Sequence, residues 1–332
     1  MKYRIITYGC QMNKSDSERI ASFLEKIGYQ PAQKESEADL ILVNMCSVRQ
    51  SAVDRVYGLF PKFEKLKTKN YKLKTILTGC ILKEDKAKFR KIFDEIWEKT
   101  PVEKFRVPSK FIPISNGCNW NCAYCVVPFT RGKLVCRSHD EILEEVKAAV
   151  ARGFKEIWLL GQNVNDYTSP TNPVIKFPEL LKLVNDIPGD FQIRFTSPNP
   201  ANFTDKLIDT IARCQKVAHY LHLPVQSGDD EILKKMRRPY TVEQYKDLVK
   251  KIRKKIPDIN LSTDIIVGFP GETKKQFENT VKLMKEIKFD MAYIAKYSPR
   301  PGTAAFQMKD DVPWQEKKRR ENILRALLKT LE

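Results

Sequence analysis

The chain has 332 residues, 42% of them hydrophobic, which suits two domains or one large domain with an extension, either able to bury a substantial core. No stretch approaches the roughly 18 consecutive apolar residues of a membrane span, and the N-terminus lacks the apolar region of a signal peptide. We therefore expect a cytoplasmic protein with no membrane partner, in which the eight cysteines act as metal or catalytic ligands rather than disulfides.

The charge of the chain indicates a polyanionic partner. Lysine and arginine number 59 against 41 aspartate and glutamate, a formal net charge of +18, which makes nucleic acid the first partner to consider. The excess gathers in four clusters, and a solvated helix face is the alternative for each of them. The clusters lie at residues 62–74, 234–238, 250–255 and 317–320.

The first hundred residues predict three strand-then-helix units, with strands at residues 3–8, 40–43 and 75–77. These strands lead to Cys10, Cys46 and Cys80. Alternating strands and helices predict a parallel sheet, and its carboxyl edge, where open α/β folds place ligands, would gather the three cysteines. Three unrelated buried thiols are the alternative, because free cysteine is among the most buried residue types. A helix is predicted over residues 15–27, ended by a left-handed Gly28.

Prolines at positions 101 and 108 indicate a linker over residues 101–110, and a second strand-helix series begins with a strand at residues 111–115. Further strands are predicted at residues 156–160, 191–195, 220–223, 260–267 and 291–297. Six units are too few for a complete eight-unit barrel, so we expect a partial barrel over residues 111–307 with its site at the carboxyl ends of the strands. Ser138 and Glu141 predict a capping box for the helix that runs to Gly153. Residues 308–332 predict a basic C-terminal helix.

The loop after the first strand of this series carries Cys118, Cys122 and Cys125, at spacings of four and three residues. Three thiolates this close can hold one metal centre, and thiolates favour zinc or iron-sulfur clusters. A four-iron cluster bound by three cysteines leaves one iron open for chemistry. The alternative is a structural zinc site completed by Cys136, although closed zinc sites usually pair their ligands as two Cys-x2-4-Cys units.

The pattern Cys-x3-Cys-x2-Cys, with Tyr124 before its last cysteine, resembles the signature of the radical S-adenosylmethionine (SAM) enzymes. Residues 9–13 (GCQMN), 44–49 (NMCSVR), 79–80 (GC) and 117–132 (GCNWNCAYCVVPFTRG) are similar to the radical SAM methylthiotransferases. Four further segments are similar to the tRNA-modifying MiaB branch of that family. They are residues 159–165 (LLGQNVN), 223–230 (LPVQSGDD), 262–273 (STDIIVGFPGET) and 296–303 (KYSPRPGT).

The resemblance implies an α/β fold, in which a flavodoxin-like parallel-sheet domain at residues 1–100 precedes a TIM-like partial (β/α)6 radical SAM barrel. It also implies methylthiolation of C2 of N6-isopentenyladenosine at position 37, next to the tRNA anticodon. Adenine C2–H is not acidic enough for ordinary base chemistry, so the reaction needs a radical and a nearby sulfur, both of which cofactors supply.

The resemblance further implies two 4Fe-4S clusters. The catalytic cluster, at which SAM is cleaved to a 5'-deoxyadenosyl radical, would be held by Cys118, Cys122 and Cys125. The second cluster, whose open iron carries the sulfur, would be held by Cys10, Cys46 and Cys80. SAM would be both radical source and methyl donor. Candidate SAM contacts are Tyr124, Gln162, Asn163, Gln226 and Ser227; ordinary turn chemistry is the alternative for the last four, which lie just past strand ends.

The implied partners are the tRNA anticodon stem-loop, a reductant such as flavodoxin or ferredoxin, and a sulfur-cluster carrier. The family's C-terminal RNA-binding TRAM domain is expected to be absent, because the chain stops at Glu332, roughly where that domain would begin. Cys136 occupies a position where the family typically has serine, and Asn199 one where the MiaB branch commonly has histidine. Cys136 and Cys214 have no partner at metal-ligand spacing and are expected to be packing residues.

Two other functions stay open at this point. The first is a methylthiotransferase that acts on threonylcarbamoyl-adenosine in tRNA or on a ribosomal protein. The second is a zinc or iron-sulfur RNA-binding protein without catalysis.

Overall fold

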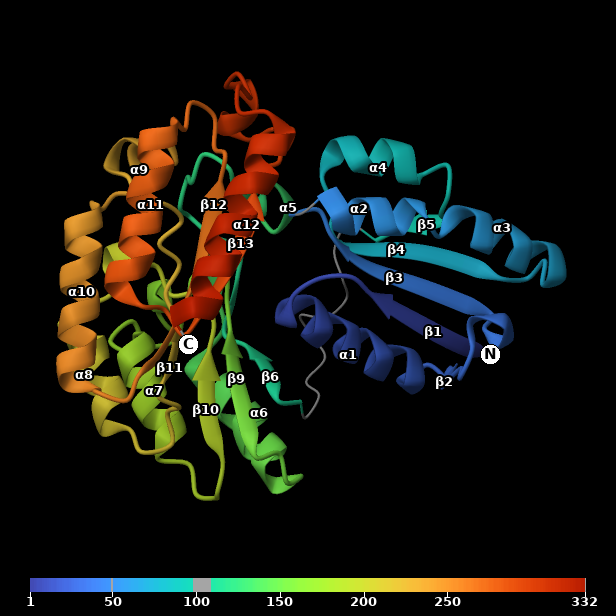
Figure 1. The fold of residues 1–332 in the computed structure, drawn as a ribbon. Coiled ribbons are helices and arrows are strands. Elements are labelled where there is room, and N and C mark those ends of the chain that lie inside the picture. The colour runs from blue at the N-terminus through green and yellow to red at the C-terminus, as the bar shows by residue number, and fades with distance from the viewer. Residues whose placement is uncertain (49, 98–108, 332) are drawn as a thin grey trace.

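The computed structural model describes residues 1–48, 50–97 and 109–331, which form two α/β regions joined side by side (Figure 1). The predicted α/β class is confirmed in both. The predicted linker at residues 101–110 falls outside the described residues except for its last two positions, and Arg49 of the NMCSVR segment also falls outside them. None of the helices in the described part of the chain is long and apolar enough to cross a membrane.

The N-terminal region is a five-stranded parallel sheet in the order β2-β1-β3-β4-β5. This is the flavodoxin-like strand order that the resemblance implied. The two edge strands were missed from the sequence because two residues carry no alternating pattern. The strands are β1 (Lys2–Thr7), β2 (Gln30–Pro31), β3 (Leu40–Cys46), β4 (Lys74–Cys80) and β5 (Glu95–Ile96).

Helices cover both faces of this sheet. On one face Ile20 and Leu24 of α1 pack against Leu42, and on the other Phe63 and Phe89 belong to a second apolar cluster. The central strand β3 is therefore buried on both sides, as an apolar run in a parallel sheet predicts. The helices are α1 (Gln11–Lys26), α2 (Gln50–Tyr57), α3 (Phe60–Lys69) and α4 (Lys83–Phe89).

Helix α1 begins four residues earlier than the predicted residue 15, so that Cys10 is its N-cap residue. The Cys10 N–H donates to Asn13 Oδ1 at 3.3 Å, so the Asn13 side chain satisfies a backbone donor at the start of the helix. The C-terminal end is as predicted, because Gly28 follows the helix with a φ of 92°.

The second region contains six parallel strands that lie in chain order around a partial barrel. They form two three-stranded sheets, which a bridge between Ile193 and Val217 connects. Within the described ranges no strand pairing joins the last strand to the first, so the barrel is open, as predicted. The strands are β6 (Phe111–Pro113), β9 (Glu156–Leu160), β10 (Gln192–Phe195), β11 (Tyr220–His222), β12 (Asn260–Val267) and β13 (Met291–Lys296).

A short antiparallel hairpin, β7 (Ser115–Asn116) with β8 (Val135–Cys136), frames the cysteine loop. The predicted strand at residues 111–115 is thus split, because residues 115–116 pair with this hairpin partner instead. The helices of this region are α5 (Val127–Thr130), α6 (His139–Ala151), α7 (Phe177–Asn185), α8 (Asp205–Arg213), α9 (Asp230–Lys235), α10 (Val242–Lys255), α11 (Lys274–Ile287) and α12 (Trp314–Leu331).

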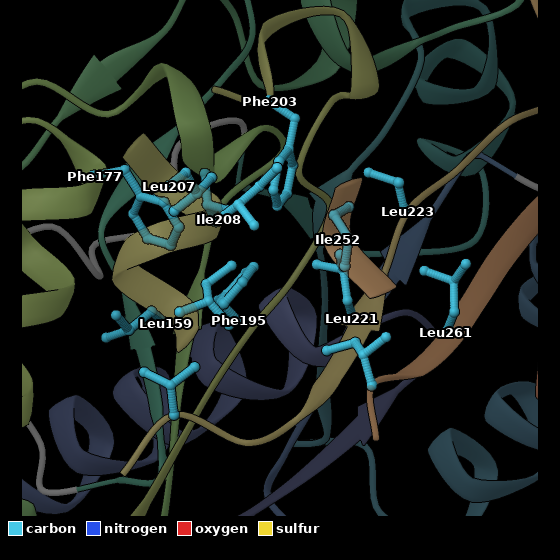
Figure 2. Close-up of a cluster of buried hydrophobic side chains, with 14 of the residues drawn as sticks. Leu159, Phe177, Phe195, Phe203, Leu207, Ile208, Leu221, Leu223, Ile252 and Leu261 are labelled. Carbon is cyan, nitrogen blue, oxygen red and sulfur yellow. The ribbon is translucent and has the colours of Figure 1, made fainter. Parts of the chain in front are cut away.

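The main core lies between the barrel strands and the helices outside them. Figure 2 shows Phe177 of α7, Leu207 and Ile208 of α8, and Phe195 of β10 gathered in this layer. The capping box predicted for α6 is wrong. Ser138 makes no capping hydrogen bond, because its hydroxyl donates to Asp140 at 3.4 Å, and the Glu141 carboxylate pairs with Arg137 at 3.7 Å.

Buried polar contacts join the two regions. Ser15 of α1 donates to the Phe111 carbonyl at 3.0 Å, and Arg19 of α1 forms an ion pair with Glu145 of α6, which also accepts from Arg137 at 2.7 Å. A buried ion pair that lost one partner would leave an uncompensated charge, so these contacts favour one relative placement of the regions. In Figure 1 the tips of β1 and β3 point toward the barrel.

Candidate functional site

Gly117 sets the start of the loop that carries Cys118, Cys122 and Cys125, the loop trio. Its φ of 79° is a left-handed conformation that glycine adopts without strain. A Cβ atom at this position would lie 2.1 Å from the Lys133 carbonyl oxygen. Cys118 then donates its backbone N–H to the Gly132 carbonyl at 3.1 Å. The loop therefore begins fixed against the β7–β8 hairpin.

The middle of the loop is held from two sides. The Ala123 N–H donates to the Met236 carbonyl at 3.0 Å, and the Ala123 carbonyl accepts from the Ala305 N–H at 2.7 Å. Within the loop, the Cys125 N–H donates to the Cys122 carbonyl at 3.1 Å. These bonds fix the backbone of the loop that carries the three cysteines, at the carboxyl edge of the barrel.

Two donors face the sulfur atoms of the loop trio. The buried Arg238 guanidinium donates to Cys122 Sγ at 3.5 Å, and the Trp120 backbone N–H donates to Cys118 Sγ at 3.4 Å. Burial raises the pKa of the Cys118 thiol, and it raises the pKa of the Cys125 thiol to about 12. A metal centre must displace these protons, and the two donors would then stabilise the thiolates.

Tyr124 packs beside this group, against a cluster that contains Ile232, Met236 and Phe269. Burial raises the pKa of its phenol well above the ordinary value, so the ring stays neutral. The structure thus places Tyr124 at the loop trio, while its contact with SAM stays a prediction.

Cys10, Cys46 and Cys80, the sheet trio, meet at the carboxyl edge of the N-terminal sheet. Cys46 and Cys80 are opposite each other in the register of β3 and β4, and a hydrogen bond between their thiols raises the pKa of Cys46. Cys10 follows β1, which pairs in parallel with β3, so it lies at the same edge of the sheet. The convergence predicted from the strand ends is therefore present in the structure.

Two buried asparagines hydrogen-bond to each other next to the sheet trio. Asn13 Nδ2 donates to Asn44 Oδ1 at 2.9 Å, and Asn44 Nδ2 returns a bond to the Asn13 carbonyl at 2.8 Å. Both residues are fully buried, so unpaired amides there would be costly. Gly79 lies against this pair with a φ of 105°, and a Cβ atom on it would come within 2.2 Å of the Met45 carbonyl.

Arg131 links the segment that follows the loop trio to a sulfur of the sheet trio. It follows α5 in the barrel region, and its Nε donates to Cys80 Sγ at 2.9 Å. Its other two nitrogens donate to Asp16 at 2.8 Å and to Asn116 at 3.0 Å. The hydrogen bond from Cys46 and the positive charge of Arg131 together lower the pKa of Cys80. In Figure 1, α5 lies between the barrel and the tip of β3.

Sequence reasoning missed Arg131 and Arg238 as functional residues. Each reaches a cysteine of a distant segment, and no local spacing shows such a contact. The available signal was position, because Arg131 is the only charged residue of the segment VVPFTRG, which directly follows the loop trio.

The predicted SAM contacts after β9 carry buried polar atoms without partners. Among the described residues, Gln162 Oε1 and Asn163 Nδ2 make no hydrogen bond, and neither does the Ser115 hydroxyl, which lies next to Gly161. Buried polar atoms are nearly always paired, so such atoms at the carboxyl edge of the barrel suit a polar ligand. Asn163 Oδ1, by contrast, accepts a hydrogen bond from the Asn199 N–H at 3.1 Å.

The predicted contacts after β11 divide into two kinds. Gln226 has a φ of 71°, and its backbone is bonded to Asp264 at 2.8 Å and to Ile266 at 3.0 Å. A strained, well-anchored residue at a strand end suits a ligand site. Ser227 is fully buried and its hydroxyl accepts from the Asp229 N–H at 3.3 Å, which is turn chemistry.

The donor chemistry of both trios suits iron-sulfur clusters. Within residues 1–48, 50–97 and 109–331, no three Cys, His, Asp or Glu side chains form a site for one metal ion. Each trio offers three free thiols and one arginine that donates to a sulfur, which suits a larger, anionic cluster. Cys136 and Cys214 pack on the barrel core, as expected.

Half of the basic cluster at residues 317–320 is internal, while Lys318 and Arg319 are exposed. Lys317 and Arg320 of α12 are buried, and they pair with Asp310 at 2.6 Å and with Glu272 at 2.6 Å. These two cations therefore neither bind a polyanion nor form a solvated helix face. In the 250–255 cluster, Lys255 pairs with Asp209 at 2.9 Å but stays exposed.

Comparison with known protein families gives two matches. Residues 112–284 match the model of the Radical SAM superfamily, and residues 2–97 match that of "Uncharacterized protein family UPF0004". The first match contains the loop trio and the second contains the sheet trio.

Among curated proteins, the chain is similar to enzymes named tRNA-2-methylthio-N(6)-dimethylallyladenosine synthase. It is 44% identical to that of Dehalococcoides mccartyi, with 98% of this chain and 82% of the relative covered. It is 41% identical to that of Clostridium botulinum strain Langeland, with 97% and 80% covered.

Among solved structures, the fold is similar to the radical SAM methyltransferase TsrM from Kitasatospora setae, solved with cobalamin and a 4Fe-4S cluster bound. The TM-score is 0.63 at 12% identity, covering 92% of this chain and 76% of that one. The cobalamin-dependent radical enzyme OxsB gives a TM-score of 0.60 at 11% identity, covering 99% of this chain and 56% of that one. At these identities the likeness concerns the fold alone.

Proposed function

The chain belongs to the tRNA-2-methylthio-N(6)-dimethylallyladenosine synthases, a family of radical SAM methylthiotransferases, and we propose that it methylthiolates C2 of N6-isopentenyladenosine at tRNA position 37. The family uses SAM and 4Fe-4S clusters. The alternatives with another modified adenosine, a ribosomal protein or no catalysis have less support from these relatives.

The observation that carries the proposal is the pairing of two cysteine trios across one interface. Each trio lies at the carboxyl edge of a parallel sheet, and Arg131 reaches from the segment after one trio to a sulfur of the other. A reaction that needs a radical and a sulfur at the same carbon requires two such centres close together. A single radical centre would not need the sheet trio.

We assign the loop trio to the cluster that cleaves SAM and the sheet trio to the cluster that carries the sulfur. When bound, these groups supply the radical that activates C2 and the sulfur and methyl groups that replace its hydrogen. The chain's own residues hold and orient them. Arg238 donates to Cys122, and the unpaired atoms of Gln162, Asn163 and Ser115 are available to SAM.

The anticodon loop suits this site because its bases lie outside a duplex and cost less to extrude than paired bases. Exposed lysines of the 62–74, 234–238 and 250–255 clusters would contact phosphates. We further propose a cytoplasmic location, where tRNA is modified, with a reductant such as flavodoxin or ferredoxin and a sulfur-cluster carrier as partners.

Nucleoside analysis tests the proposed function. tRNA from cells that lack the gene should lack 2-methylthio-N6-isopentenyladenosine and accumulate the unmethylthiolated nucleoside, and the gene should restore the product. An unchanged nucleoside profile would contradict the proposal. Anaerobic reconstitution should give about eight irons per chain, and about four when the loop trio is changed to alanine.

The salt dependence of tRNA binding tests the electrostatic part. We expect log Kd to vary with log salt with a slope of about 0.7 to 0.9 per phosphate neutralised. Lys317→Ala should alter stability rather than this slope, because Lys317 is buried. Affinity that does not depend on salt would contradict this binding mode.

A further inference from the structure

We propose that Arg131 is a positioning residue that orients the sheet trio toward the loop trio and raises the reduction potential of the cluster bound by the sheet trio. This inference rests on the proposed function in one respect, namely that the sheet trio holds a cluster. Beyond the proposed function, it gives Arg131 of the barrel region a role at the cluster of the N-terminal region.

The contacts of Arg131 are those of a fixed, largely buried cation. Its side chain is 11% exposed, and all three guanidinium nitrogens have acceptors within 3.0 Å. Asp16 and Cys80 belong to the N-terminal region, whereas Asn116 belongs to the barrel region. A guanidinium with three separate acceptors has one orientation, so its bond to sulfur is set by the interface as a whole.

The charges around Arg131 show why a sulfur partner matters. Asp16 supplies one negative charge to the buried guanidinium. The remaining favourable partner is the sulfur of Cys80, which a metal centre keeps as a thiolate. An arginine that served only to join the two regions would need the carboxylate but would not need to donate to a sulfur at 2.9 Å.

The local backbone ties this arginine to the loop trio. Only the short helix α5 separates Arg131 from Cys125, and the Arg131 N–H donates to the Val127 carbonyl at 2.8 Å. A cluster bound by the loop trio and a cluster bound by the sheet trio would therefore be held in a defined relation by one turn of helix and one side chain.

The physical effect on a cluster follows from electrostatics. Hydrogen bonds to ligand sulfur and nearby positive charge stabilise the reduced state, which carries one more negative charge. The corresponding hydrogen bond at the loop trio is longer and therefore weaker, since Arg238 donates to Cys122 at 3.5 Å. We infer that the sheet-trio cluster owes part of its potential to the other region of the molecule.

Arg300 offers a matched control. It is also a buried barrel-region arginine that reaches the N-terminal region, with Nη1 at 2.5 Å from Gln50 and Nη2 at 3.3 Å from Asp85. No cysteine is among these partners. Loss of Arg300 would therefore weaken the interface without removing a donor to sulfur.

The experiment is a potentiometric titration followed by electron paramagnetic resonance. The parent is the full chain in which Cys118, Cys122 and Cys125 are alanine, so that only the sheet trio holds a cluster. Arg131→Met should lower the midpoint so that the ratio of reduced to oxidised cluster at the parent midpoint falls about tenfold, equivalent to about 59 mV for one electron. Arg300→Met should leave the midpoint unchanged.

Three outcomes would overturn the inference. The first is an unchanged midpoint in Arg131→Met with full iron content, and the second is an equal shift in Arg300→Met. If Arg131→Met holds no iron, Arg131→Lys decides, because lysine keeps the charge but not the three bonds. A midpoint of Arg131→Lys below that of the parent supports the inference, and a midpoint equal to that of the parent is the third outcome that contradicts it. A parent chain that binds no cluster would instead overturn the proposed function.

Discussion

The loop trio occupies eight consecutive residues, whereas the sheet trio takes its members from the ends of three separate strand-helix units. The loop trio is close in sequence and depends on distant backbone groups, such as the Met236 carbonyl, for its shape. The sheet trio is distant in sequence and depends on strand register, which places Cys46 opposite Cys80.

The comparison shows that two different kinds of local structure can bring three cysteine thiols to one site. In the first, a glycine turn and long-range loop anchors shape a short segment. In the second, a parallel sheet delivers one thiol from each of several strand ends, and buried asparagines hold the ends together. The two trios should therefore fail in different ways when they are changed.

The largest expected effect separates the tasks of the two trios. Cys122→Ala should abolish both SAM cleavage and the methylthio product, whereas Cys46→Ala should keep SAM cleavage and lose the product. Release of 5'-deoxyadenosine and nucleoside analysis measure the two activities. Cys214→Ala, in the barrel core, is the control and should keep both. A methylthio product from Cys46→Ala would show that the sheet trio has no part in sulfur transfer.

The dependence of the loop trio on its turn can be tested at Gly117. Alanine there would suffer left-handed strain of about 1–2 kcal/mol and a backbone clash that adds about 1–3 kcal/mol. Gly132 has the same φ of 79° with no atom within 4 Å of a Cβ, so Gly132→Ala should cost only the strain. Urea unfolding of both variants measures the difference. Equal losses would mean that the clash relaxes and the turn does not fix the loop.

The next effect concerns the arginine of the loop trio. Arg238→Met removes the donor to Cys122, and we expect iron retention at the loop trio to weaken by about 10- to 100-fold while the sheet trio keeps its iron. Arg237→Met, at the exposed neighbouring position, is the control. Chelator titration with iron counting provides the measurement. Equal iron loss from both trios would indicate a general loss of structure.

The smallest effect is the ionisation of the metal-free thiols. Burial raises the pKa of Cys125 to about 12, whereas Cys46 and Arg131 lower the pKa of Cys80. Cys125 therefore contributes stability below the ordinary thiol pKa that is lost as pH rises toward 12. Cys80 contributes stability above the ordinary value that is lost as pH falls through its lowered pKa.

Thiolate absorbance of the iron-free protein, compared with that of Cys80→Ala and Cys125→Ala, separates the two ionisations. The signal lost in Cys80→Ala should titrate at the lower pH. If both signals titrated at the same pH, the electrostatic contrast between the trios would be wrong.

The sequence was sufficient for the long elements. Strands β9 and β12 have the predicted bounds, because buried apolar runs with clear ends leave little choice. The two-residue strands β2 and β5 were missed, because their pairing comes from neighbouring strands rather than from their own residues. The capping box at Ser138 was wrong since Arg137, one position earlier, competes for Glu141.

The candidate site divides in the same manner. Cysteine spacing and strand ends identified both trios, since those features are local or follow from topology. Arg131 and Arg238 act across long separations, and residues around them do not reveal which sulfur they will meet. The unpaired atoms of Gln162 and Asn163 likewise become visible only when burial is known.

The bonds of Ala123 have a consequence for synthesis of the protein. Both of its partners, Met236 and Ala305, lie more than a hundred residues later in the chain. A ribosome that has released the first hundred residues has made every thiol of the sheet trio, but the loop trio cannot take its final shape until the last strand of the barrel has emerged. The thiols of the sheet trio are thus all synthesised before the backbone groups that shape the loop trio exist.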